Sequence, residues 1–197
     1  MLNNYSTRSI TWIRTLVLTL FLAAGMNATR ASHIAGSDLT YQSLGNGTYL
    51  VTYTMYRDCF GITAPSSAYL SVASNSCGQA VQSIQMTQVP GTGQEITPTC
   101  STSASTCNGG TEPGIEEYEY TALVQLPLGC PDWHLWVDDC CRNQAITTVQ
   151  NPDAGLYIEA YLNNTVVESS SPTFNNVPIV FFCIGQTNYF NLGAVDA

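Results

Sequence analysis

Short segments of alternating apolar and polar residues recur along the chain, and no segment shows the apolar period of an amphipathic helix. The clearest examples are Thr48–Arg57 and Leu156–Leu162. Because successive side chains of a strand point to opposite faces, one face of each segment should pack on a core. The predicted inward residues are Tyr49, Val51, Tyr53 and Met55, then Leu156, Ile158, Ala160 and Leu162, whereas Tyr157, Glu159 and Tyr161 should point outward.

Residues that interrupt strands separate these segments. Gly, Pro, Asn and Ser favour turns, and Gly45, Asn46 and Gly47 are predicted to close a β-hairpin. Seven or eight short strands at this spacing predict an all-β fold, an antiparallel β-sandwich of Ig-like architecture with a long polar loop at Pro98–Gly114. The expected strands are Leu39–Ser43, Thr48–Arg57, Ala68–Ala73, Val81–Val89, Tyr118–Leu126, Trp133–Asp138, Leu156–Leu162 and Ile179–Cys183.

Residues 1–31 have the layout of a secretory signal peptide. Arg8 and Arg14 precede the apolar run Leu16–Gly25, and small residues follow it. A membrane-spanning helix needs about 20 apolar residues. The apolar run here is shorter, because Arg14 limits it on one side and Arg30 on the other. We therefore expect cleavage after Ala31, a single mature domain at residues 32–197, and export of that domain to the cell surface or the medium.

The mature part is strongly acidic. It contains no lysine, and its two arginines minus its fourteen acidic residues give a formal charge of −12. Such a charge repels phosphate backbones and anionic lipid, so we expect neither nucleic acid nor, after signal cleavage, a membrane as partner. The 45% hydrophobic and 10% charged residues indicate a folded domain rather than a disordered one.

All eight cysteines lie in the mature part. An even number of cysteines in an exported chain predicts a disulfide framework, although spacing alone does not fix the pairing. Proximity in the sequence favours disulfides between Cys59 and Cys77 and between Cys100 and Cys107. Of the remaining four cysteines, Cys130 would bond to Cys140 or Cys141, and the other of these two would bond to Cys183.

The segment WVDDCCRN places Cys140 and Cys141 side by side. Two adjacent thiols do not easily share one zinc tetrahedron. A bond between them would close a strained ring through their own peptide. Since adjacent strand side chains point to opposite faces, we expect two different disulfide partners. Arg142 is predicted to form a structural ion pair with Asp138, Asp139 or another carboxylate.

Candidate catalytic groups are few. Glu116, Glu117 and Glu119 resemble the clustered carboxylates of a glycosidase. Carboxylates at the start of a strand in an acidic exported chain are more often solvated, so we expect no enzyme. The sequence also contains no G-x-S-x-G elbow, no P-loop and no dinucleotide fingerprint.

Metal ligands are also weakly indicated, and no cofactor is expected. His134 shares its predicted strand face with Trp136 and Asp138, which is typical of an ordinary strand histidine. The pair Asp138 and Asp139, together with Asp153, offers carboxylates for Ca²⁺, but no regularly spaced calcium loop accompanies them.

Four aromatic residues form a candidate ligand surface: Trp133, Trp136, Tyr157 and Tyr161. Aromatic rings present large apolar faces with polar edges, which suits stacking on sugars. A carbohydrate-binding module is therefore one alternative function, and a glycoside hydrolase using the clustered glutamates is another.

Several motifs together resemble a known group of proteins. They are ASHIAGSDLTYQ, YRDC, STCNGGTEPGIEEYEYTALVQLP, DWHLWVDDCCRN, NPDAGLYIEAYLNN and SPTFNNVP. The chain from about Ala31 onward resembles the N-terminal region of large secreted Bacteroidota surface proteins, which are PKD-repeat-containing, gliding-motility-associated or adhesin-like substrates of type IX secretion. The resemblance implies a non-enzymatic, extracellular structural or binding module, with further β-domains, surface glycans or other cell-surface proteins as partners.

The end of the sequence departs from this group. There, GAVD leads into an acidic stretch that resembles an interdomain Ca²⁺ site, whereas this chain ends at GAVDA. The resemblance therefore implies either a fragment of a longer protein or a short exported relative. Asp196 would be the first carboxylate of a calcium site whose other ligands are missing.

Overall fold

The fold is an all-β, antiparallel sandwich. The computed structural model describes residues 34–97, 103–143, 154–178, 185, 187 and 189–196, all within one unit, Ala31–Ala197. The signal-peptide residues lie outside the described residues. The strands are β1 (Ile34–Gly45), β2 (Thr48–Asp58), β3 (Ser67–Ser74), β4 (Gln79–Gln88), β5 (Gln94–Glu95), β6 (Ile115–Gln125), β7 (Trp133–Asp139), β8 (Leu156–Leu162), β9 (Thr173–Phe174) and β10 (Ala194–Val195), with a 3₁₀ helix η1 (Thr106–Asn108).

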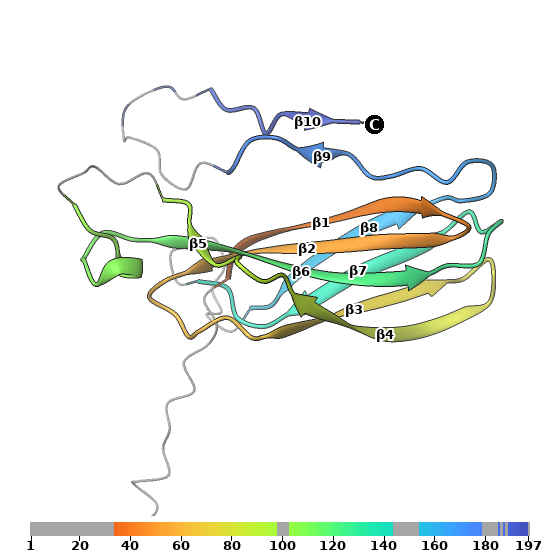
Figure 1. The fold of residues 1–197 in the computed structure, drawn as a ribbon, viewed down its shortest axis with the longest axis horizontal. Helices are drawn as coiled ribbons and strands as arrows, with labels where there is room; N and C mark the ends of the chain where they lie inside the picture. The colour runs from red at the N-terminus through yellow and green to blue at the C-terminus, as the bar shows by residue number, and fades with distance from the viewer. Residues whose placement is uncertain are drawn as a thin grey trace, which may run out of the picture. The chain divides into compact units, whose positions relative to one another are not determined.

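The long strands are hydrogen-bonded in the order β1-β2-β6-β4-β3-β7-β8, and all their pairings are antiparallel (Figure 1). β5 pairs with β6, and β9 pairs with β10 in a separate two-stranded sheet. β4 joins the two halves of the sandwich through only two residue pairs, Thr87 with Thr121 and Gln88 with Tyr120. One half therefore consists of β1, β2 and β6, and the other of β3, β4, β7 and β8.

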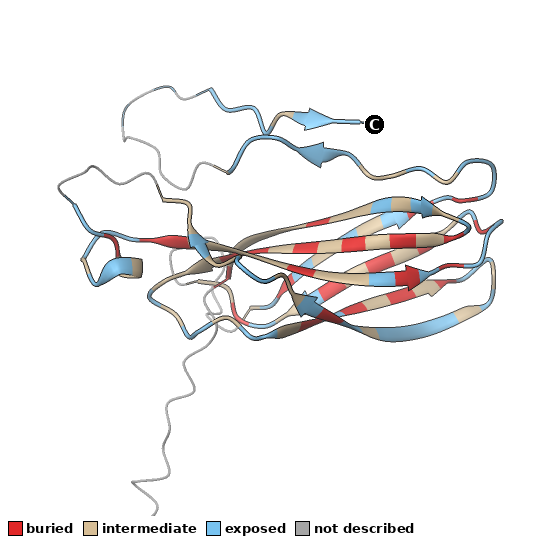
Figure 2. Cartoon of the chain, viewed as in Figure 1, coloured by how far each residue is buried: buried red, intermediate tan, exposed pale blue. Residues whose placement is uncertain are grey.

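The predicted alternation is confirmed. Figure 2 shows buried and more exposed positions alternating along β2, and Tyr49, Val51, Tyr53 and Met55 are all buried. Leu156 and Leu162 of β8 are also buried, while Tyr157 and Tyr161 are exposed. Seven predicted strands coincide with strands of the structure, whereas Ile179–Cys183 lies outside the described residues.

The core lies between the inward faces of the two halves. Its fully buried side chains come from both: Tyr49, Val51, Tyr53 and Tyr120 from one half, Leu70, Met86, Trp133 and Leu135 from the other. At about 25 cal/mol per Å² of apolar area, each of the large side chains stabilises the fold by roughly 1.5 to 3 kcal/mol.

The segment that follows β8 covers the edge of β1. The Tyr41 backbone N–H donates to Ser171 Oγ (2.9 Å), and the Ser171 N–H donates back to the Tyr41 carbonyl (2.9 Å). Farther along, the Gly47 N–H donates to Glu168 Oε2 (2.7 Å). An exposed strand edge leaves backbone N–H and C=O groups free to pair with another chain. This segment forms hydrogen bonds with some of those groups on β1. No helix within the described residues is both long and apolar enough to cross a membrane.

The disulfide framework differs from the predicted one at Cys59. This cysteine bonds to Cys107, not to Cys77. The reason lies in the sheet: Asp58 at the end of β2 pairs with Ile115 at the start of β6. The polar loop that precedes β6 is thereby brought beside Cys59, whose N–H donates to the Gly114 carbonyl (2.9 Å).

The predicted pairing of Cys130 is also wrong, because Cys130 bonds to Cys77. β3 and β7 are antiparallel neighbours, with Ala73 opposite His134. The turn after β3 and the residues before β7 therefore lie together, and the two Cα atoms are 5.9 Å apart, within the range that a disulfide spans. Cys100 and Cys183 lie outside the described residues, but the pairings predicted for them are wrong, because Cys107 bonds to Cys59 and Cys140 bonds to Cys141.

Cys140 and Cys141 bond to each other, contrary to the expectation of two different partners. The alternation rule does not apply to them, because β7 ends at Asp139. Cys141 has a left-handed backbone with φ of 77°, so its side chain does not follow the strand direction. The Cys141 carbonyl accepts from the Ile34 N–H (3.2 Å), and this contact ties the cysteine pair to the start of β1.

The predicted ion pair of Arg142 is not found. The ion pairs of the described residues join Arg57 to Glu116 and His134 to Glu159. The backbone of Arg142, not its charge, binds this segment to the fold: its N–H donates to the Ala154 carbonyl (3.0 Å).

Candidate functional site

The outer surface of the β7–β8 hairpin gathers three aromatic residues, one histidine and two carboxylates. We call it the β7–β8 face. Strand alternation directs these side chains away from the core, and the antiparallel register places them in three cross-strand pairs. The pairs are His134 with Tyr161, Trp136 with Glu159, and Asp138 with Tyr157.

Three rings of this face are stacked. The His134 and Trp136 ring centroids are 4.5 Å apart, and those of His134 and Tyr161 are 4.6 Å apart with nearly parallel planes. Stacking holds these three rings in fixed positions, while Tyr161 remains 62% exposed. Tyr157, beside them on the same face, is 51% exposed. Large side chains held rigidly at the surface are suited to ligand binding, because little conformational entropy is lost when they make contacts.

A hydrogen-bond network connects the polar atoms of the face. Glu159 Oε2 accepts from the Tyr157 hydroxyl (2.9 Å) and lies 2.9 Å from His134 Nε2. The hydrogen bond from Tyr157, followed by that from His134, lowers the pKa of the Glu159 carboxyl. Desolvation and the Glu159 carboxylate raise the pKa of Tyr157 to about 12. Glu159 is therefore an ionised acceptor, and Tyr157 remains a neutral donor.

Trp133 does not belong to this surface, contrary to the sequence prediction. It is only 2% exposed, and its indole Nε1 donates to the Pro127 carbonyl (3.2 Å). Trp133 and Trp136 are three positions apart, an odd number, so the two-residue period of a strand places them on opposite faces. The sequence prediction missed His134 and Glu159 as members, although their outward position follows from the same period.

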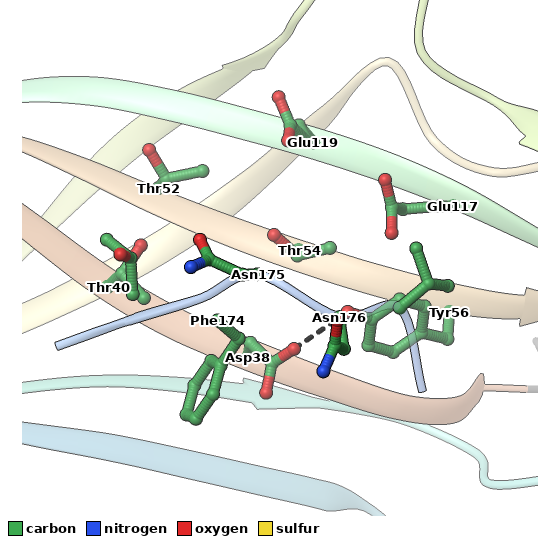
Figure 3. A pocket seen from close by; sticks show the side chains of 12 residues that line it. Asp38, Thr40, Thr52, Thr54, Tyr56, Glu117, Glu119, Phe174, Asn175 and Asn176 are labelled. Carbon is green, nitrogen blue, oxygen red and sulfur yellow. Dashed lines mark hydrogen bonds between the residues drawn. The ribbon is translucent and has the colours of Figure 1, made fainter. Parts of the chain in front are cut away.

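A second surface feature is a groove of about 260 Å³ over the outer side of β1, β2 and β6. Figure 3 shows residues from these strands and from the segment Thr173–Val177 around it, and we call it the Asp38 groove. Its carboxylates are Asp38, Glu117 and Glu119, and its lining residues include no lysine, arginine or histidine.

Two groups in the Asp38 groove have altered acidity. The Tyr56 hydroxyl donates to Asp38 Oδ2 (2.7 Å; Figure 3), and burial together with this carboxylate raises the pKa of Tyr56. Partial burial, then the nearby charges of Glu119 and Asp38, raise the pKa of Glu117.

The three candidate glutamates do not form one cluster. Glu117 and Glu119 line the Asp38 groove, whereas Glu116, on the opposite face of β6, pairs with Arg57 at 2.5 Å and accepts from the Tyr118 hydroxyl at 2.9 Å. Strand alternation separates Glu116 from the other two.

The described residues offer one grouping with metal-ligand geometry, Cys59, Cys107 and Glu116. Its sulfurs are bonded to each other, and its carboxylate is paired with Arg57, so the group supplies no thiolate. Of the aspartates considered for Ca²⁺, Asp139 is partly buried and accepts from the Cys140 N–H (2.9 Å), and Asp153 lies outside the described residues.

Comparison with known proteins gives no match: no protein-family profile, no curated protein and no solved structure shows significant similarity to this chain.

Proposed function

We propose that this chain is a non-enzymatic, exported binding module of a bacterial surface protein of the adhesin or gliding-associated type, and that it binds carbohydrate on the β7–β8 face. Further β-domains of the same protein would present the module at the cell surface. The observation that carries the proposal is the exposed, stacked ring array with a hydrogen-bonded carboxylate beside it.

The chemistry of the face suits a sugar. Pyranose rings have apolar C–H faces and hydroxyl edges, so they need both aromatic surface and polar partners. Tyr157 and Tyr161 supply exposed rings, and Glu159 supplies an ionised acceptor. Acceptors that carry charge make hydrogen bonds about twice as strong as neutral ones.

The disulfides support export of the module. Bonds such as Cys59–Cys107 and Cys77–Cys130 persist in oxidising compartments and are rare in the cytosol. The secretory signal layout of residues 1–31 agrees with this placement.

The test is glycan binding by residues 32–197, followed by calorimetric titration of the glycans retained on an array. Trp136→Ala and Tyr161→Ala should each weaken binding by at least about 1 kcal/mol, roughly fivefold, as expected for central aromatic contacts. Tyr189→Ala is the matched control, because Tyr189 is 92% exposed and lies outside the β7–β8 face. Absence of any bound glycan, or equal losses in all three variants, would contradict the proposal.

A second candidate function, glycoside hydrolysis, is favoured by one observation in the Asp38 groove. Glu117, whose carboxyl pKa is raised by partial burial and nearby charges, lines the groove together with Glu119, and glycosidases use a pair of carboxyl groups of which one has a raised pKa. Hydrolysis that is lost in both Glu117→Gln and Glu119→Gln but retained in Glu112→Gln would support this function over the binding module.

A further inference from the structure

We propose that the ligand of the β7–β8 face is a glycan with free amines, that is, a cationic amino sugar polymer. This inference rests on the proposed function and names its ligand class. Three observations lead to it: the arrangement of charges among the rings, the state of the carboxylates, and the charge of the whole chain.

The charges of the face are placed among its aromatic rings. Asp138 lies opposite Tyr157, and Glu159 lies opposite Trp136, so each carboxylate has an aromatic side chain as its cross-strand neighbour. The face contains no lysine or arginine. An ammonium group bound here would lie near a carboxylate and near an aromatic ring, and both attract cations.

The Glu159 carboxylate has capacity for an external donor. Its hydrogen bonds from Tyr157 and His134 both use Oε2, and Tyr161 also contributes a side-chain hydrogen bond. A carboxylate offers about four acceptor positions on two oxygens, so these three partners leave capacity for an external donor. Because those same hydrogen bonds lower the pKa of Glu159, the carboxylate is ionised at mildly acidic pH, where the amine of an amino sugar is protonated.

The negative electrostatic field of the whole chain also favours a cationic ligand. The full sequence has a formal charge of −9 with no lysine. Such a field raises the local concentration of cations and repels uronate or sulfated glycans. A neutral glycan would use the rings and the hydrogen-bond acceptors of the face, but it would form no ion pair with Asp138 or Glu159.

The experiment compares four hexasaccharides at mildly acidic pH by calorimetric titration against residues 32–197. They are β-1,4-linked glucosamine, its fully N-acetylated form, the corresponding glucose hexamer and a galacturonate hexamer. Exposed charge pairs strengthen association by up to about fivefold each, so two of them should make the glucosamine hexamer bind on the order of tenfold more tightly than its N-acetylated form. The galacturonate hexamer should bind most weakly.

Substitutions test whether the preference for glucosamine arises at the β7–β8 face. Glu159→Gln keeps an oxygen acceptor for Tyr157 while removing the charge, and it should abolish most of the glucosamine preference while weakening binding of the glucose hexamer far less. Asp138→Asn should act in the same direction. Glu112→Gln changes the net charge equally, but Glu112 lies in the loop before β6, and this control should retain the preference.

The outcomes separate the inference from the proposed function. Equal binding of the glucosamine, N-acetylated and glucose hexamers would overturn the amino-sugar inference and leave a carbohydrate-binding face. Binding of none of the four would overturn the inference, and an array with no retained glycan would then overturn the proposed function as well. A preference that falls equally in Glu112→Gln and Glu159→Gln would also contradict the inference, because it would come from net charge alone.

Discussion

The Cys77–Cys130 disulfide should stabilise the fold far more than the Cys140–Cys141 disulfide. In the chain-entropy account, a disulfide stabilises by restricting the unfolded chain, and its effect increases with the length of the closed loop. Cys77 and Cys130 are 53 positions apart, which corresponds to about 4 kcal/mol. Cys140 and Cys141 are adjacent, so their bond closes only the small ring through their own peptide and restricts the unfolded chain very little.

The comparison uses two double variants, Cys77→Ala with Cys130→Ala, and Cys140→Ala with Cys141→Ala. Each double variant removes one buried sulfur and one that is more exposed. The buried ones are those of Cys130 and Cys141. The packing loss is therefore similar, and the difference in the free energy of unfolding reports mainly on loop closure.

The assay is equilibrium unfolding in urea without reductant, analysed by linear extrapolation, with peptide mapping of each variant to verify the remaining bridges. We expect the first variant to lose roughly 3 to 4 kcal/mol more than the second. Equal losses, or a greater loss in the Cys140 and Cys141 variant, would refute the reasoning.

Three further predictions concern stability. In urea unfolding, Gly47→Ala should destabilise the protein by about 2 kcal/mol more than Gly45→Ala. Both glycines have positive φ, but of the two only Gly47 would place a Cβ against backbone, 2.4 Å from the Leu126 carbonyl oxygen. Burial raises the pKa of the Asp139 carboxyl, so the stability contributed by Asp139 is full below its pKa in the unfolded chain and is lost as pH rises through its pKa in the folded protein. Above the folded-state pKa, Asp139→Asn should therefore have a higher melting temperature than the parent. A lower melting temperature would contradict this. Arg57→Met should cost about 2 kcal/mol because it leaves Glu116 partly buried without its partner, and addition of Glu116→Gln should restore part of the loss.

The strands could be predicted because their information is local. Tyr49, Val51 and Tyr53 alternate with threonine and leucine, and burial of one face follows from that period alone. The hairpin at Gly45–Gly47 is equally local, since its positive φ values favour glycine. The short strands β5, β9 and β10 were not predicted, because two residues carry no period.

The disulfides could not be predicted because their pairing depends on strand order. Cys77 meets Cys130 only because β3 and β7 are neighbours, although β3 and β7 are separated in sequence by β4, β5 and β6. The Cys140–Cys141 bond escaped prediction for a different reason: the alternation of β7 was extended past its last residue, Asp139.

The candidate site was predicted in part. Trp136, Tyr157 and Tyr161 are on one face as their outward positions require, but their assembly with His134 depends on the β7–β8 register. Trp133 was assigned to the same surface from its residue type, and its core position shows that the strand period is the stronger criterion.

The most direct test of the account is an NMR titration of isotope-labelled residues 32–197 with the glucosamine hexamer. We predict that the largest shift changes fall on the side chains of Trp136, Tyr157 and Tyr161, with smaller changes at their β7 and β8 backbone amides. Shift changes centred on the Asp38 groove, at Thr52, Glu117 and Glu119, would contradict the assignment of the binding site to the β7–β8 face.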